Sequence, residues 1–412
     1  MNTLSLFKVS PALLILCIAC TETSYPDSLW NPDESEAPDP VITAVEPVEG
    51  VLGGVEEITI SGENFSDDSD LNKVHIGGSR ARVLSSTATQ LVVLAPDLAG
   101  DSLKVHVATI GAYLFDVYDP YELFDPVINY GEFHKTKDRK SADAFGLAVD
   151  SLENLYVSVS PKQIIRVDPQ GVPTLYATID ASKFDFMCMG PGGYLYGLLS
   201  QKYILRVLPE GTAIEVYQTP EKIIQLDFGS DGIAYAAGGG GKVFRLTTDG
   251  SISEAASYPW DVTINTIRVF GDYVYTAGFF AGNDTVNFIA GIWRHRIISG
   301  NTLLGDPELV FDWGSFAGKF GPVINDMTFT GTGDLLLAAS EEIALYILKE
   351  PYDQNSPQQF YPFVGELEPP INAIVWGQGR YAYINYKPSD ADTRTVKRVT
   401  MTVDGAPYWG RK

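Results

Sequence analysis

The feature that most constrains the fold is a short apolar pattern that recurs six times after residue 119. Each copy alternates apolar side chains as a β-strand does, and the copies begin at Phe145, Asp185, Ile224, Asn265, Asn325 and Asn372. These first residues are spaced by 40, 39, 41, 60 and 47 positions. A repeat of this length predicts similar units, each too small to bury a core alone, that stack against one another.

Two further strand patterns and a weaker fourth one follow the first in most units. The third pattern has Arg at its centre in five of the six units, as in residues 165–167 and 205–207. Four strands in a unit of about 40 to 50 residues are typical of a propeller blade, so the repeats predict a six-bladed β-propeller over residues 119–412. Two segments could supply a strand that closes the ring, residues 125–130 or residues 406–409.

Residues 40–118 show a different pattern, in which short β-rich runs alternate with turn clusters. The runs are residues 41–45, 57–60, 73–76, 90–94 and 103–107. About seven short strands in some eighty residues are typical of an immunoglobulin-like sandwich. The sequence therefore predicts an all-β chain, with an immunoglobulin-like sandwich followed by a six-bladed β-propeller.

Both regions resemble known families in their motifs. In the sandwich, the glycines of residues 50–54, the run 58–65 that ends in Phe65, and the Gly77-Gly78 turn follow the order of the IPT/TIG family. In the propeller, an Arg-centred strand followed by a Gly turn, as in residues 165–171, resembles NHL repeats and the related YVTN and SMP-30-type propellers. The first resemblance implies a module for binding, spacing or dimerisation rather than for catalysis.

Residues 1–19 resemble the signal peptide of a bacterial lipoprotein. Lys8 precedes an apolar run that is short for a membrane span, and Ala19 lies directly before Cys20 as in a lipobox. The resemblance implies an acyl chain on Cys20; a plain signal peptide and an uncleaved anchor are the alternatives. Residues 20–39 are acidic and proline-rich without a hydrophobic period, which predicts a tether and also resembles the surface-export signals of Bacteroidota lipoproteins.

Charge and cysteine content exclude some function classes. The 412 residues contain 29 Lys and Arg against 52 Asp and Glu, a formal net charge of −23. Binding to a phosphate backbone relies on cationic side chains that release counterions, so this charge argues against nucleic acid as a partner. Of the three cysteines, Cys188 alone would remain as a free thiol in a processed, lipidated chain, and its strand context predicts a buried, inert thiol.

The sequence lacks the common catalytic and metal-binding motifs. Its four histidines, His75, His106, His134 and His295, are not spaced as metal ligands, and no His-Glu-x-x-His, Gly-x-Ser-x-Gly or paired-cysteine motif occurs. We therefore expect no catalytic residue, no metal site, no cofactor and no enzymatic activity.

Four polar residues occupy the same position in the innermost strand of their units: Asp185, Asn265, Asn325 and Asn372. Because innermost strands line the central channel of a propeller, we expect these side chains to converge at one mouth of it. Their oxygens could coordinate a Ca²⁺-type cation or hydrogen-bond a sugar, and the resemblance to SMP-30-type lactonases implies carboxylate and Asn ligands in that place. Three interpretations stay open: amides that satisfy backbone groups, a ligand site and a hydrolytic site.

Five aromatic residues lie near connections between blades or in insertions: Trp260, Phe279, Phe280, Trp313 and Phe316. Exposed rings stack on sugars and anchor protein interfaces, so these residues are candidates for a binding platform. Burial between blades is the alternative.

These observations predict a lipoprotein of the bacterial outer membrane that faces the periplasm or the cell surface. Its expected function is non-catalytic binding of a glycan or another envelope protein by the propeller, as in the accessory parts of Bacteroidota surface uptake systems that it resembles. The lipid anchor is the only membrane contact expected. The alternatives are a metal-dependent lactonase or esterase that uses the propeller channel, and a structural scaffold of the envelope.

Overall fold

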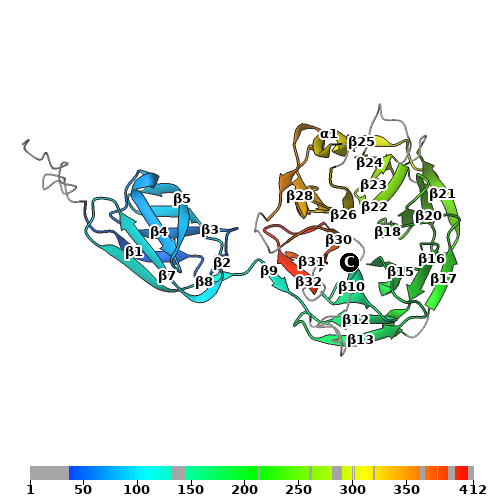
Figure 1. Ribbon diagram of the computed structural model, residues 1–412, viewed down its shortest axis with the longest axis horizontal. Coiled ribbons are helices and arrows are strands. Elements are labelled where there is room, and N and C mark those ends of the chain that lie inside the picture. The colour runs from blue at the N-terminus through cyan, green and yellow to red at the C-terminus, as the bar shows by residue number, and fades with distance from the viewer. Residues whose placement is uncertain are drawn as a thin grey trace, which may run out of the picture.

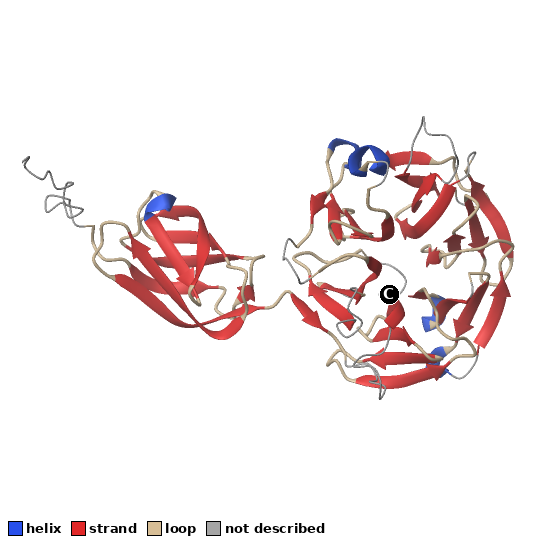
Figure 2. Cartoon of the chain, viewed as in Figure 1, coloured by secondary structure: helices blue, strands red, loops and turns tan. Residues whose placement is uncertain are grey.

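The computed structural model describes residues 37–131, 144–199, 201–211, 214–258, 262–280, 290–298, 300, 302–318, 321–361, 367–377, 379–387 and 395–406. Strands dominate these residues and form two bodies, a sandwich and a ring of six sheets (Figures 1 and 2). The described helical segments are α1 (Trp313–Ala317) and the 3-10 turns Ser69–Leu71, Pro191–Gly193, Pro209–Gly211 and Tyr352–Gln354. None of the helices within these ranges is long and apolar enough to cross a membrane.

The sandwich consists of eight strands in two layers. One layer has the order β1 (Val41–Glu46), β3 (Glu57–Glu63), β6 (Gln90–Leu94) and β5 (Ser79–Thr87). The other continues with β4 (Asn72–Ile76), β7 (Gly100–Thr109), β8 (Phe115–Phe124) and β2 (Val51–Leu52). Strand β5 joins the layers, because it pairs with β4 at its start and with β6 at its end. Alternate side chains of the two layers, among them Ile58, Ile60 and Val107, are fully buried between them.

The motif residues of the sandwich have structural roles, and the Gly77-Gly78 turn is confirmed. Gly77 and Gly78 form the β4–β5 hairpin turn with φ of 58° and 87°, the left-handed region that favours glycine. Phe65 is buried in the sandwich core, and its ring fills the space where a side chain at Gly62 would lie.

The ring contains six sheets of four antiparallel strands each, which follow one another in chain order. Blade 1 consists of β10 (Ala144–Val149), β11 (Leu155–Val159), β12 (Gln163–Val167) and β13 (Pro173–Thr178). Blade 2 consists of β14 (Met187–Met189), β15 (Leu195–Leu199), β16 (Tyr203–Val207) and β17 (Ile214–Gln218). Blade 3 consists of β18 (Gln225–Phe228), β19 (Ala234–Ala237), β20 (Lys242–Leu246) and β21 (Ile252–Ser257). Blade 4 consists of β22 (Val262–Phe270), β23 (Tyr273–Phe280), β24 (Ala290–Arg296) and β25 (Glu308–Phe311). Blade 5 consists of β26 (Ile324–Phe329), β27 (Leu335–Ala339), β28 (Leu345–Leu348) and β29 (Gln358–Gln359). Blade 6 consists of β30 (Ile371–Trp376), β31 (Tyr381–Tyr386), β32 (Thr395–Thr400) and β9 (Val127–Asn129).

The ring is closed by a strand that precedes the first blade in sequence. Strand β9 pairs antiparallel with β32 and forms the fourth strand of blade 6, with Val127 opposite Val399. Of the two segments that the sequence left open, residues 125–130 therefore supply the closing strand. Ala406 instead donates its N–H to the carbonyl oxygen of Phe329 in blade 5, at 2.9 Å, beside a bridge between Thr330 and Gly405.

The arginine that recurs in the third strand of the blades has a structural role. Its guanidinium lies over a tyrosine at the start of the second strand, or directly before it, in three blades: Arg206 over Tyr194, Arg294 over Tyr273 and Arg398 over Tyr381, at 4.7, 4.5 and 4.5 Å from the ring centroids. Cation–π contacts of this kind add to the packing between strands of one sheet. In these three blades the repeated Arg therefore contributes to packing within the blade.

Two residues, Asp125 and Pro126, connect the sandwich to the ring. Beside this connection, Nη1 of Arg380 in blade 6 lies 3.2 Å from Oε1 of Glu56 in the sandwich. Val55 also packs against the core cluster of blade 6. The sandwich thus contacts the propeller at the blade that its own chain closes (Figure 1).

Candidate functional site

Each blade is an antiparallel meander, so its innermost strand runs along the channel in the same direction as those of the other blades. The two ends of the channel therefore differ. The innermost strands β10, β14, β18, β22, β26 and β30 contact their neighbours around the ring. All of them begin at one end of the channel, which we call the N-mouth, and finish at the other, the C-mouth. The connections between blades and those between second and third strands also join strand ends at the N-mouth.

A cavity of about 90 Å³ with both polar and apolar walls opens at the N-mouth. Asp185, Asn325 and Asn372 all line it, together with the amide side chains of Gln201 and Gln225. Such a volume admits several water molecules or the polar groups of a ligand. Three of the four residues predicted to converge at a channel mouth are thus brought together.

Asn265, the fourth predicted residue, has a structural contact instead. Its Nδ2 donates to the carbonyl oxygen of Ile324, 3.1 Å away on the next blade. Asn325 repeats the contact, because its Nδ2 donates to the carbonyl oxygen of Ile371 at 3.0 Å. These two amides connect blade 4 to blade 5 and blade 5 to blade 6, as expected for amides that satisfy backbone groups.

Two lysines also reach the N-mouth. Lys183 lies 2.6 Å from Oδ1 of Asp185. Its Nζ and that of Lys387 each lie 3.8 Å from the ring centroid of Phe145. The N-mouth therefore holds two ammonium groups beside amides and one carboxylate, in a chain whose net charge is strongly negative.

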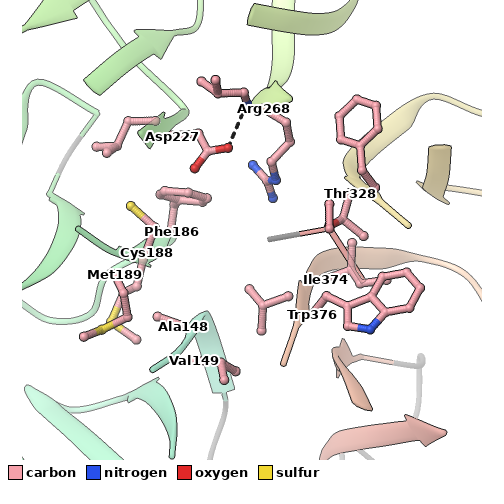
Figure 3. Close-up of a pocket in the computed structure, with 16 residues that line it drawn as sticks. Ala148, Val149, Phe186, Cys188, Met189, Asp227, Arg268, Thr328, Ile374 and Trp376 are labelled. Atoms are coloured by element: carbon pink, nitrogen blue, oxygen red, sulfur yellow. Dashed lines mark hydrogen bonds between the residues drawn. The ribbon is translucent and has the colours of Figure 1, made fainter. Parts of the chain in front are cut away.

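A second cavity lies deeper in the channel. Its volume is about 40 Å³, and each blade contributes the residue three positions after the start of its apolar pattern: Ala148, Cys188, Asp227, Arg268, Thr328 and Val375 (Figure 3). Ala406 lines the same cavity. This ring of equivalent positions shows that the innermost strands line the channel, as the repeats predicted.

A buried charge network crosses the channel between the two cavities. Asp326 is 1% exposed, and its Oδ1 accepts hydrogen bonds from Arg268 at 2.6 Å and from Thr266 at 3.0 Å. Its Oδ2 accepts from the backbone N–H of Ile374 in blade 6 at 2.9 Å. Gln225 of blade 3 donates to Asp326 and accepts from Arg268. The side chain of Asp326 thus bonds to blades 3, 4 and 6 from its own place in blade 5.

The same network separates the cavities. Phe186 lines both of them, and the guanidinium of Arg268 lies 5.8 Å from its ring centroid. Arg268 lines the deeper cavity, and its partner Gln225 lines the N-mouth cavity. A ligand at the N-mouth therefore meets the ring of Phe186 and the amide of Gln225, and Arg268 lies on the other side of them.

Burial governs the ionisable groups of the deeper cavity. Burial raises the pKa of Asp227, although nearby Arg268 and the N–H groups of Val269 and Phe228 oppose the shift. Burial also raises the pKa of the Cys188 thiol well above its usual value. A high pKa disfavours the nucleophilic thiolate. Cys188 is half-buried in the cavity wall, so the expectation of a buried thiol is wrong.

The predicted aromatic platform is dispersed. Trp313 is 1% exposed, and its indole N–H donates to the carbonyl oxygen of Pro322, so this ring belongs to a core and the expectation of an exposed platform residue is wrong there. Phe316 is exposed, and its ring packs edge-on against Tyr346 and at a tilt against Trp313. Phe279 is half-buried on β23, whereas Trp260 and the side chain of Phe280 lie outside the described residues.

The sequence interpretation missed the network residues Gln225, Arg268 and Asp326. One signal could have identified two of them, since Arg268 and Asp326 are ionisable residues within apolar runs of innermost strands. Buried charges in such runs are rare unless they are paired, so each charge implies a partner on a neighbouring blade.

The fold and the N-mouth define a class, a propeller with a polar channel mouth carried behind an immunoglobulin-like module. Residues 40–120 match the family model of the IPT/TIG domain. No curated protein matches the chain.

Solved structures with the same fold include two auxiliary nutrient binding proteins. The one from Bacteroides thetaiotaomicron is 16% identical, with a TM-score of 0.51 over 88% of this chain and 97% of that chain. The one from Bacteroides ovatus is 15% identical, with a TM-score of 0.51 over 90% of this chain and 99% of that chain. A luciferin-regenerating enzyme is 14% identical, with a TM-score of 0.51 over 69% of this chain and 98% of its own. These identities establish a shared fold alone.

Proposed function

We propose that the protein is a lipid-anchored, non-catalytic binding protein of the bacterial outer membrane, which presents the N-mouth of its propeller to a glycan. The observation that carries this proposal is the N-mouth cavity, where Asp185, Asn325 and Asn372 meet. Amide and carboxylate groups that converge on one hollow are suited to bind the hydroxyl groups of a sugar. The shared fold with two nutrient binding proteins is consistent with this function.

The composition of the N-mouth also favours a polar ligand. Asn372 is exposed, and Gln201 adds an amide to the cavity wall. The ammonium groups of Lys183 and Lys387 could accept an acidic sugar, which the rest of this acidic surface would repel. An envelope protein as the ligand is the second possibility within the same binding function.

The double substitution Asp185→Ala with Asn372→Ala is expected to weaken glycan binding about tenfold or more, because each lost hydrogen bond contributes about 0.5–1.5 kcal/mol. Neither residue is part of the backbone contacts that join the blades, so the fold is expected to persist. Retention of the full chain on a series of immobilised polysaccharides measures the effect. Asp180→Ala is the matched control, since Asp180 is also paired with a lysine, Lys162, but lies outside the cavity.

Retention that is the same for the double variant and for Asp180→Ala would contradict a glycan site at the N-mouth. If no gel retains the unmodified protein, the glycan proposal fails and an envelope protein becomes the ligand to test. The double variant and Asp180→Ala are then compared by chemical crosslinking in the intact envelope.

A metal-dependent lactonase or esterase is the alternative that the N-mouth cavity suggests, because Asp185, Asn325 and Asn372 offer oxygen ligands. Lys183 opposes it, since its ammonium group is already 2.6 Å from Asp185. Within the described ranges, no three His, Cys, Asp or Glu residues are grouped as metal ligands. We expect elemental analysis of the purified chain to find no stoichiometric divalent cation, and a lactone panel to show no turnover. If the chain holds a cation and has an activity, and the double variant Asp185→Ala with Asn325→Ala loses both, then hydrolysis would replace binding as the function of the N-mouth.

A further inference from the structure

The sandwich has an apolar surface that the binding function does not use. The turn between β7 and β8 exposes Ile110, Tyr113, Leu114 and Phe115, with exposed fractions of 55, 57, 65 and 60%. We call these four residues the hairpin patch. Large apolar side chains that are exposed together, instead of singly, mark contact with another surface.

Two aspartate side chains hold this turn in place. Oδ1 of Asp39 accepts hydrogen bonds from the N–H groups of Tyr113 and Leu114, at 3.1 and 2.8 Å. Oδ2 of Asp116 accepts from the N–H of Ile42 at 2.7 Å. The turn is therefore fixed to the start of the sandwich chain, while its apolar side chains stay outside the core.

The described chain begins directly beside the hairpin patch. The N–H of Ala37 donates to the carbonyl oxygen of Gly111, at 3.1 Å. Cys20 lies 17 positions earlier in the sequence, and 17 residues span at most about 60 Å. An acyl chain on Cys20 would therefore hold this end of the sandwich within about 60 Å of the bilayer.

The propeller lies at the opposite end of the sandwich. Strand β8 starts with Phe115 in the patch and ends with Phe124 beside the ring. Ten residues of strand are about 33 Å long. The patch and the start of the described chain thus share the pole that is remote from the propeller (Figure 1).

We infer that the hairpin patch rests on the lipid bilayer that holds the acylated Cys20, so that the sandwich stands on the membrane with the propeller held away from it. This inference depends on the lipid anchor of the proposed function. Aromatic and aliphatic side chains partition into the interface between headgroups and acyl chains, and a second weak contact strengthens a lipid anchor. The contact is apolar, so it is compatible with the negative charge of the chain and with zwitterionic lipids. It adds to the anchor, which the sequence suggested as the sole membrane contact.

The test places a fluorophore on the patch of the full lipidated chain. Leu114→Cys in a Cys188→Ala background offers one free thiol, because Cys20 is acylated, and an environment-sensitive dye is attached there. In vesicles of phosphatidylcholine and phosphatidylethanolamine we expect a blue shift, and strong quenching by lipids with a nitroxide near the headgroup. The matched control is Val216→Cys, a residue on the outer strand of blade 2 with a similar exposed fraction of 58%. Its dye is expected to show neither effect.

Added Phe115→Asp should largely abolish quenching at position 114, because it puts a charge into the contact. Equal emission and equal quenching at positions 114 and 216 would overturn the inference. A blue shift that grows with protein density but is insensitive to nitroxide lipids would assign the patch to a second copy of the chain, which also overturns it. If the mass of the purified protein shows no acyl chains, both the lipid anchor and this inference are overturned. Glycan retention by the propeller is measured separately.

Discussion

Replacing Asp326 by alanine is expected to lower the free energy of unfolding by about 3–5 kcal/mol, the cost of breaking a buried ion pair by removing one partner. The substitution leaves Arg268 charged and largely buried, and it removes the acceptor for the N–H of Ile374. Urea unfolding followed by tryptophan fluorescence measures the change, since Trp293, Trp313 and Trp376 are all buried in the propeller.

Two further variants separate the network from a general effect of losing a carboxylate. Asp326→Asn keeps the volume and an acceptor but loses the charge, so an intermediate loss is expected. Asp231→Ala removes an exposed carboxylate that accepts one backbone hydrogen bond, from Ile233, and should cost at most about 1 kcal/mol. An Asp326→Ala protein as stable as Asp231→Ala would show that Asp326 does not hold the blades together.

Placing a charge in the closing strand is the second change with a large expected effect. Val127→Asp buries an unpaired carboxylate in the core of blade 6 and should lower the free energy of unfolding by more than about 3 kcal/mol. The neighbouring substitution Ile128→Asp is the matched control, because alternate side chains of a strand face opposite ways and Ile128 is only half-buried. Its effect is expected to be below about 1 kcal/mol.

Hydrogen exchange shows whether the loss in Val127→Asp comes from opening of the ring. We expect faster exchange first in β32 and β31, which lose their outer neighbour, and later in the other blades. If β32 in Val127→Asp stays as protected as β28 of blade 5, then β9 is not what closes the propeller.

Local patterns were sufficient to predict the strands. The run 90–94 was predicted from its apolar alternation and is strand β6, and the six channel strands were predicted from the same kind of alternation. Alternation is a property of neighbouring residues, so it survives in a single sequence. The choice between residues 125–130 and 406–409 was not local, because it depends on pairing across the whole propeller.

The channel site could be predicted only in part, because irregular pairing interrupts the alternation. In blade 5 the register shifts between Ile324 and Asp326, and blade 4 has the same shift between Ile264 and Thr266. A bulge turns the residues after it to the other face. The Asn is the unpaired residue of the bulge in blades 4 and 5 and remains at the N-mouth, while the residue three positions after it lines the deeper cavity. The partners of Asp326 lie on three other blades, and no local pattern specifies such contacts.

The position of β9 in the sequence also determines when the propeller can finish folding. The strand leaves the ribosome before any blade, whereas its partner β32 is among the last segments of the sequence. A chain that emerges from its N-terminus can therefore complete the sandwich early, but its propeller remains an open arc until the final blade has arrived. During that interval strand β9 lacks its partner β32, and exposed strand edges are sites of aggregation. Folding of this chain from its N-terminus thus has a vulnerable period, whose length is the time needed for the whole propeller to become available.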